Sequence, residues 1–147
     1  MLEDNKALAR KVYEECFSKG KLDLVDEIYS KDCTFHDPVF PQMGAGAESM
    51  RRHIQMCRSA FPDLRFVVND IIAEKDEVVL HWTATGTQQG QFLGVVPTHR
   101  QASVTGTSIC RIKNGKIIEQ FADWNLLTML EQLGAATAPR QTVAAQR

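Results

Sequence analysis

The strand predicted nearest the end of the chain carries the side chains with the clearest potential for chemistry. Phe121, Asp123 and Asn125 share one of its faces, because successive side chains in a strand point to opposite sides of the sheet. If Phe121 faces the interior, Asp123 is desolvated beside it, and its pKa rises above the ordinary value of about 3.9. Such a carboxyl can act as a general acid or base. The opposite register, in which this face meets water or a dimer partner, stays open from one sequence.

Other polar side chains lie at two further places in the predicted strands. His36 and Asp37 end a short strand just before Pro38, where loops often present reactive groups from a rigid scaffold. His81 and Thr83 are two residues apart and therefore share a strand face. A polar row of this kind can line a ligand cavity, although threonine is also favoured on the solvent face of a sheet.

The sequence offers little support for a nucleophile or a metal site. No Ser or Cys lies in a nucleophile motif, so hydrolysis by a Ser/His/Asp arrangement is not indicated. The histidines are never spaced i,i+2 or i,i+4, and there is no CxxC pair. His53, beside Arg51 and Arg52, is expected on a partly exposed helix face. Reduced and mostly buried thiols are expected at Cys16, Cys33, Cys57 and Cys110.

The composition limits the classes of partner. The chain has 147 residues, about the length of one ordinary domain. Its formal charge of -1 lacks the positive excess that binding to nucleic acid needs, so no nucleic-acid partner is expected. Its apolar runs are far shorter than the roughly 20 residues of a membrane-spanning helix. We therefore expect a cytoplasmic protein without a membrane partner.

Hydrophobic spacing divides the chain into a helical first part and a β-rich second part. Before Pro62, apolar residues recur every three or four positions, which is typical of helices with one buried face. After Pro62 they alternate with polar residues, which predicts antiparallel strands, and Asn114-Gly115 predicts a tight hairpin. The expected helices span 5–17, 22–29, 48–61 and 126–133. The expected strands span 33–36, 64–69, 78–85, 102–113 and 116–124.

This order of elements predicts an α+β fold in which helices cover one face of a curved, mostly antiparallel sheet. A pocket on the concave side of that sheet is the first place to look for function. Phe92, at the centre of the irregular segment 86–100, is expected to pack on the sheet as part of a short lid. We expect one domain over residues 1–134. Residues 135–147 have no periodic apolar face and are expected to form a mobile tail.

Four blocks of sequence, in this order along the chain, resemble the SnoaL-like polyketide cyclase family, also called ester cyclases. They are AFPDLR at 60–65, WTATGT at 82–87, GQFLGVVPT at 90–98, and EQF at 119–121 followed by EQLG at 131–134. The resemblance implies a cone-shaped α+β barrel of the nuclear-transport-factor-2-like fold, with an apolar cavity. It also implies a homodimer or higher oligomer formed through the outer sheet face. In the polyketide cyclases of the family, an aspartate near the end of the last strand catalyses an aldol closure without a metal or organic cofactor.

One departure from the family pattern affects the expected mechanism. The pattern resembles Glu-x-Trp-x-x-x-Asp, in which Glu119 fits, Phe121 replaces the Trp, and Asn125 stands where the Asp is expected. A neutral amide cannot take a proton from carbon near pH 7, although it can hydrogen-bond an enolate oxygen. Our hypothesis is that Asp123 is the acid and base and that Asn125 orients the substrate oxygen. Substrate contacts are expected from His36, Asp37, His81, Thr83, Phe92 and Phe121.

The resemblance leaves three classes of function open. The first is an enzyme that acts on a small hydrophobic carbonyl compound by cofactor-free proton transfer, in aldol cyclisation, isomerisation or hydration. The second is a non-catalytic module that holds a small apolar ligand in the same pocket. The third is a protein-interaction domain that recruits a partner through the sheet face. Fold alone does not choose among them.

Overall fold

The computed structural model describes residues 1–137 and 139 of the chain. Its helices lie mostly before its strands, as the change in hydrophobic spacing predicts. The helices are α1 (Leu2–Lys11), continued by a π-helix over Val12–Phe17, a 3-10 turn at Leu22–Leu24, α2 (Val25–Ile28), α3 (Ala47–Ala60) and α4 (Leu126–Gln132). The strands are β1 (Tyr29–His36), β2 (Arg65–Glu74), β3 (Glu77–Thr87), β4 (Gln101–Lys113) and β5 (Lys116–Trp124).

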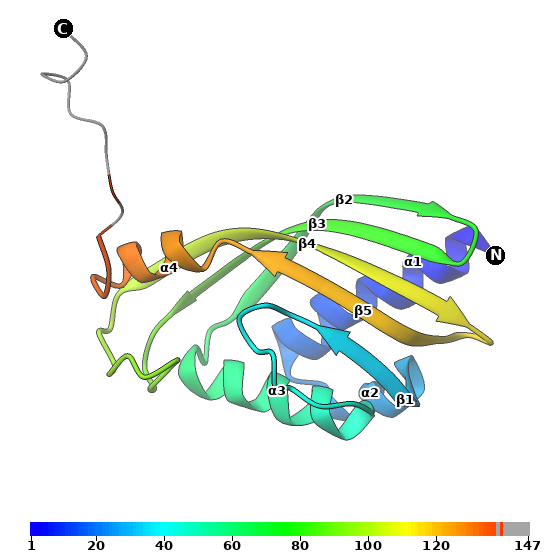
Figure 1. The fold of residues 1–147 in the computed structure, drawn as a ribbon, viewed down its shortest axis with the longest axis horizontal. Helices are drawn as coiled ribbons and strands as arrows, with labels where there is room; N and C mark the ends of the chain where they lie inside the picture. Colours follow the sequence, from blue (N-terminus) through cyan, green and yellow to red (C-terminus); the bar gives the residue numbers. More distant parts are fainter. Residues whose placement is uncertain (138, 140–147) are drawn as a thin grey trace, which may run out of the picture.

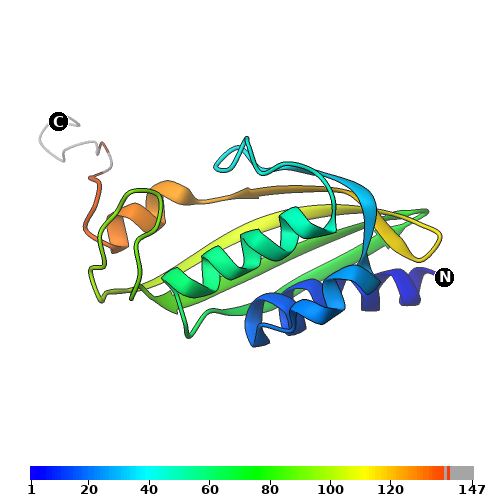
Figure 2. The same ribbon diagram turned by 90° about the horizontal axis from the view of Figure 1, so that it is seen from below.

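The strands form one curved sheet in the order β1-β5-β4-β3-β2. The first pair, β1 and β5, is parallel, and the other pairs are antiparallel. Figures 1 and 2 show α1 and α3 lying across the same face of this sheet, with α4 near one end. The predicted α+β architecture, with helices on a curved and mostly antiparallel sheet, is therefore confirmed.

The helix expected over 22–29 is shorter in the structure. Its last residue, Tyr29, has extended backbone and begins β1, where it pairs with Ile117 of β5. Its side chain is almost completely buried, so a tertiary contact overrides the helical spacing of the sequence. As a result β1 is longer than predicted and reaches from the core to His36.

A β-bulge in β5 decides which side chains face the helices. Ile117 pairs with Ile112 of β4, while Glu119 pairs with the preceding Arg111, so Ile118 is an extra residue in the ladder. The two buried side chains on either side of the bulge are Ile117 and Gln120, three positions apart. Beyond the bulge, inward positions are therefore even-numbered.

The bulge reverses which side chains face inward and which face outward at the end of β5, compared with the prediction. The inward positions there are Gln120, Ala122 and Trp124, whereas Asp123 is exposed on the outer face. The predicted inward orientation of Phe121 and Asp123 is wrong because a simple alternation does not anticipate the extra residue at the bulge.

The polar row on β3 also lies on the outer face of the sheet. The inward positions alternate through Trp82 and Ala84, so His81 and Thr83 point away from the helices. His81 lies 3.3 Å from the Asp70 carboxylate, and Thr83 accepts a 2.8 Å hydrogen bond from the Asn69 amide. Their predicted place in a cavity is wrong, because the apolar residues of this strand take the buried face.

In the part that the structure describes, no helix is both long and apolar enough to cross a membrane. The predicted tail over 135–147 falls mostly on residues 138 and 140–147, which lie outside the described residues. The boundary predicted at residue 134 stays a prediction.

Gly106, on the inward face of β4, offers a test of the packing between sheet and side chains. A methyl group on this residue would overlap the Trp82 ring and lie 2.8 Å from Trp124 Cβ. Gly106→Ala is therefore expected to lower the free energy of unfolding by about 1–3 kcal/mol, measured by urea denaturation. Thr105→Ser, at the exposed neighbouring position, serves as the control. Equal urea midpoints for the two variants would contradict this packing.

Candidate functional site

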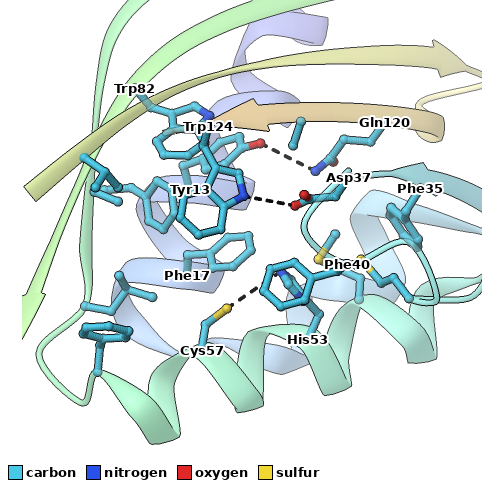
Figure 3. Close-up of a pocket in the computed structure, with 18 of the residues that line it drawn as sticks. Tyr13, Phe17, Phe35, Asp37, Phe40, His53, Cys57, Trp82, Gln120 and Trp124 are labelled. Atoms are coloured by element: carbon cyan, nitrogen blue, oxygen red, sulfur yellow. Dashed lines mark hydrogen bonds between the residues drawn. The ribbon is translucent and has the colours of Figure 1, made fainter. Parts of the chain in front are cut away.

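A mostly apolar cavity lies between the sheet, the π-helical segment, α3 and the loop after β1 (Figure 3). It has a volume of about 110 Å³ and is partly open to solvent. Aromatic rings supply much of its wall, among them Tyr13, Phe17, Phe40, Phe66, Trp82 and Trp124. The pocket therefore suits a hydrophobic molecule, because such sites combine an apolar wall with a few placed polar groups.

Asp37 is the only carboxyl group that lines this cavity in the described part of the chain. It follows β1 directly, and its Oδ1 accepts a 2.9 Å hydrogen bond from the backbone N–H of Val39. Trp124 Nε1 donates to its Oδ2 at 3.3 Å, from the end of β5. Burial raises the pKa of Asp37 above its ordinary value, and these hydrogen bonds oppose part of the rise. The group is thus half-buried, oriented, and more basic than a carboxylate in water.

His36 lies at the rim of the cavity and is supported from the outer face of the sheet. Its ring stacks on Phe121 with centroids 4.4 Å apart, and its Nε2 lies 2.8 Å from the Glu119 carboxylate. Arg111 donates to the other oxygen of that carboxylate at 2.6 Å and holds the pKa of Glu119 below its usual range. The His36 side chain is 47% exposed. Phe121, expected to contact substrate, instead backs His36 from outside the cavity.

His53 and Cys57 lie one helical turn apart on α3 and both line the cavity. Cys57 Sγ is 3.7 Å from His53 Nε2, and the imidazole edge packs on Phe40 with ring centroids 4.7 Å apart. Burial lowers the pKa of His53 to about 4 and raises that of the Cys57 thiol to about 12. Both groups are therefore uncharged near pH 7. His53 is partly exposed, as the sequence predicts. Its place in the cavity was not predicted, and the spacing of four from Cys57 was the available signal for it.

The predicted catalytic pair does not lie in the cavity. Asp123 is exposed on the outer face of the sheet, as the bulge in β5 dictates. Asn125 caps α4, where its Oδ1 accepts a 3.1 Å hydrogen bond from the backbone N–H of Thr128. Neither is among the residues that line the pocket. Of the side chains expected to contact substrate, His36, Asp37 and Phe92 do line it.

A buried hydrogen-bond network closes the end of the cavity nearest the sheet. Tyr13 Oη donates to Ser108 Oγ at 2.5 Å, and Trp82 Nε1 donates to the same oxygen at 3.0 Å. Tyr29 Oη donates to Gln120 Oε1 at 2.6 Å. The sequence gives no signal for this network, because its members are far apart in the chain and simple alternation assigns Gln120 to the outer face.

The residues that the structure describes include no cluster of three or more His, Cys, Asp or Glu side chains able to hold a metal ion. The cysteines described are all free thiols, and Cys57 is the only one of them that lines the cavity. The polar chemistry available to a ligand in the cavity is therefore that of one carboxyl, two imidazoles, one thiol, other hydrogen-bonding groups, and aromatic rings.

Comparison with protein families gives one match, to the model described as SnoaL-like polyketide cyclase, over residues 7–133. A search of curated proteins found no match. Solved structures give many matches. AclR from Streptomyces galilaeus, described as a candidate hydroxylase, is 26% identical, with a TM-score of 0.84 over 100% of this chain and 95% of its own. IdmH from Streptomyces antibioticus, described as a candidate polyketide cyclase, is 29% identical, with a TM-score of 0.77 over 88% of this chain and 98% of its own.

A more distant structure supports the fold alone. A protein from Catenulispora acidiphila with a ketosteroid isomerase-like fold is 13% identical, with a TM-score of 0.75 over 90% of this chain and 97% of its own. The chain therefore has the nuclear-transport-factor-2-like fold that the sequence blocks predict.

The neutral state of His53 predicts a specific pH dependence of stability. In the unfolded chain this imidazole takes up a proton below about pH 6.5, whereas in the folded protein it does so only near pH 4. The free energy of unfolding should therefore fall by about 2–3 kcal/mol as pH drops through this window, because the unfolded state binds the extra proton. Urea unfolding at pH 4.5, 5.5 and 7 measures the change.

His53→Phe removes this part of the pH dependence, whereas His99→Gln, at an exposed position, retains it. If the His53→Phe and wild-type proteins lose equal stability between pH 7 and pH 4.5, the imidazole is not held neutral by burial.

Proposed function

Because the chain belongs to the SnoaL-like polyketide cyclase family, we propose that it moves a proton at a carbon atom next to a carbonyl group of a small hydrophobic compound. Asp37 is the residue that we assign as general base and acid. The observation that carries this proposal is geometric: a single half-buried carboxyl, held by two hydrogen bonds, lines an aromatic cavity.

The surroundings of Asp37 support this assignment. A general base works best when its pKa approaches the operating pH, and desolvation moves the pKa of Asp37 in that direction. No Lys or Arg side chain lines the cavity, and His36 at its rim pairs with Glu119 rather than with Asp37. The hydrogen bonds from Val39 and Trp124 keep the carboxylate in one orientation.

The proposed chemistry conserves the atoms of the substrate. Asp37 removes a proton, the C–H bond breaks, and its electron pair moves toward the carbonyl oxygen to form an enolate. In a cyclisation, the enolate carbon then bonds to a second carbonyl carbon of the same molecule, and Asp37 returns the proton to the new alkoxide. In an isomerisation, the proton returns to a different carbon. The proposal uses side chains alone and includes no metal or organic cofactor.

A non-catalytic binding module is the second candidate function. Asn125 favours it, because the resemblance places an aspartate there and an amide cannot act as a base on carbon. The wall of aromatic rings is equally suited to holding an apolar ligand without turnover. The two candidates differ in whether the Asp37 carboxyl exchanges a proton with the bound molecule.

We further propose that two copies of the chain pair through the outer face of the sheet, as the resemblance implies. Val67 and Ile72 on β2 are apolar and exposed, which supports burial between copies. The homodimer and the cytoplasmic location stay predictions.

Asp37→Asn is expected to slow deuterium exchange at the α-carbon of 2-tetralone by about 10²–10⁴-fold, the usual contribution of a positioned general base. The measurement is the loss of the α-proton signals by NMR in D₂O. 2-Tetralone is a probe of the chemistry, with an apolar ring system and one enolisable carbonyl group.

Asp123→Asn is the matched control, since it makes the same change on the outer face. It should leave the rate nearly unchanged, because the Asp123 charge makes the smallest of the contributions to the pKa of Asp37. If Asp123→Asn slowed the exchange and Asp37→Asn did not, Asp123 and not Asp37 would be the general base. Binding of 2-tetralone without enzyme-dependent exchange would favour the non-catalytic module.

The pH dependence of this exchange tests the hydrogen bond from Trp124. The rate should rise with pH as Asp37 ionises, with a midpoint above the ordinary carboxyl value because burial raises the pKa. Trp124→Phe removes a donor that stabilises the charged form, so the midpoint should move to higher pH. Trp82→Phe is the control, because Trp82 donates to Ser108. A midpoint that moves down in Trp124→Phe would contradict the role of this bond.

A further inference from the structure

Gln120 is a polar side chain in the cavity wall that the proton transfer described above does not use. It is 5% exposed and lies on the inward face of β5, just beyond the bulge. Burying an amide costs free energy unless its donors and its acceptor find partners. The hydrogen bonds of this amide therefore indicate what kind of group it is positioned to bind.

The orientation of the Gln120 amide is set by Tyr29. The buried Tyr29 hydroxyl donates to Gln120 Oε1 at 2.6 Å, and the Cys110 thiol donates to the same oxygen at 3.8 Å. Burial raises the pKa of Tyr29 well above its ordinary value, so this hydroxyl keeps its hydrogen. Because Oε1 receives both donors, the Nε2 group with its two hydrogens lies on the other side of the amide.

The Nε2 group has more hydrogens than partners. Among the described residues, its one acceptor is the Tyr13 hydroxyl, at a long 3.5 Å. Tyr13 gives its own hydrogen to Ser108 at 2.5 Å, so its oxygen can accept from Gln120 but offers no hydrogen to a ligand. One amide hydrogen of Gln120 is thus left for an acceptor that enters the cavity.

The position of Gln120 relative to Asp37 follows from the sheet. β1 and β5 are parallel neighbours, with Phe35 opposite Gln120 and His36 opposite Phe121. Asp37, the next residue after β1, therefore lies two residues along the chain beyond Phe35, the residue opposite Gln120. Figure 3 shows the amide and the carboxyl reaching toward the same hollow, one from β5 and one from the loop after β1.

We propose that Gln120 binds the carbonyl oxygen of the substrate and stabilises the enolate oxygen formed from it. This inference rests on the proposed role of Asp37 as the base. A fixed N–H donor placed where negative charge develops lowers the barrier to enolisation without adding a charge to the apolar cavity. Tyr29 is the positioning residue, because it holds the amide with Nε2 toward the ligand.

The pair restricts the class of substrate to enolisable carbonyl compounds. The ligand needs an acceptor oxygen at Gln120 and, on the adjacent carbon, a C–H bond at Asp37. A hydrocarbon lacks the first group, and an aldehyde or ketone without an α-hydrogen lacks the second. The whole cavity, at about 110 Å³, is of the order of one that holds a benzene ring, and its opening to solvent leaves room for the rest of a larger molecule.

The first test is an NMR titration of the wild-type protein with 2-tetralone and with tetralin, which has the same rings without the oxygen. One Gln120 side-chain amide proton should move downfield with 2-tetralone and not with tetralin. The amide of Gln88 is the internal control, because it is equally buried and already donates to the Gly90 and Val95 carbonyl groups. Equal shifts of Gln120 with both ligands would overturn the proposal.

The second test separates a role in catalysis from a role in folding. Gln120→Met and Tyr29→Phe break the same buried hydrogen bond, but only Gln120→Met removes the donor to the substrate. Gln120→Met should lower kcat for α-carbon exchange by about 10²–10³-fold, the usual loss of one such donor. Tyr29→Phe should lower it less than about ten-fold at a similar urea midpoint. Equal losses of kcat in the two variants would show a structural role only and overturn the proposal.

The two tests distinguish this inference from the proposed function on which it rests. A downfield Gln120 proton in a protein without exchange activity would support the oxygen site and reject Asp37 as a base. Exchange that depends on Asp37, with no ligand-specific shift at Gln120, would keep the base and reject the oxygen site.

Discussion

The bulge at Ile118 is the constraint on which the rest of the cavity depends. It lets Ile117 and Gln120, three positions apart, both face the helices, so that Trp124 is also turned inward. Without the extra residue, Asp123 would replace Trp124 in the cavity, and a second carboxylate would lie close to Asp37. Two carboxylates at short range cannot both be ionised without a large cost. The bulge thus produces a cavity with one acidic group instead of two.

Burial then keeps the titratable groups in the interior of the cavity neutral, apart from Asp37. The pKa of His53 is lowered to about 4, that of Cys57 is raised to about 12, and that of Tyr13 is raised far above its ordinary value. In an apolar environment each of these groups favours its uncharged form. Asp37 is the exception, because its place at the rim and its two hydrogen bonds offset part of the desolvation. The proton chemistry that we propose therefore centres on one side chain.

The sequence was sufficient for the architecture and for part of the site. The periodicity over 48–61 and the Asn114-Gly115 hairpin locate α3 and the turn between β4 and β5 closely, because these signals are local. Asp37 could be found from its place between a strand and a proline. The inward and outward faces of β5 could not be predicted, because the bulge arises from pairing with β4 and leaves no local signature around Ile118. The same limit concealed Gln120, whose partners are about 90 or more residues away in the chain, apart from Cys110 on β4.

The parallel pairing of β1 with β5 offers a physical account of the departure at Asn125. Parallel strands end at the same edge of a sheet, so the loop after β1 and the end of β5 border one region of the cavity. The hydrogen bond from Trp124 to Asp37 joins these two ends directly. A carboxyl group expected after β5 can therefore be replaced in function by one after β1, without any change in the fold. Asn125 is then free to serve as the cap of α4, where its side chain accepts from the backbone of Thr128.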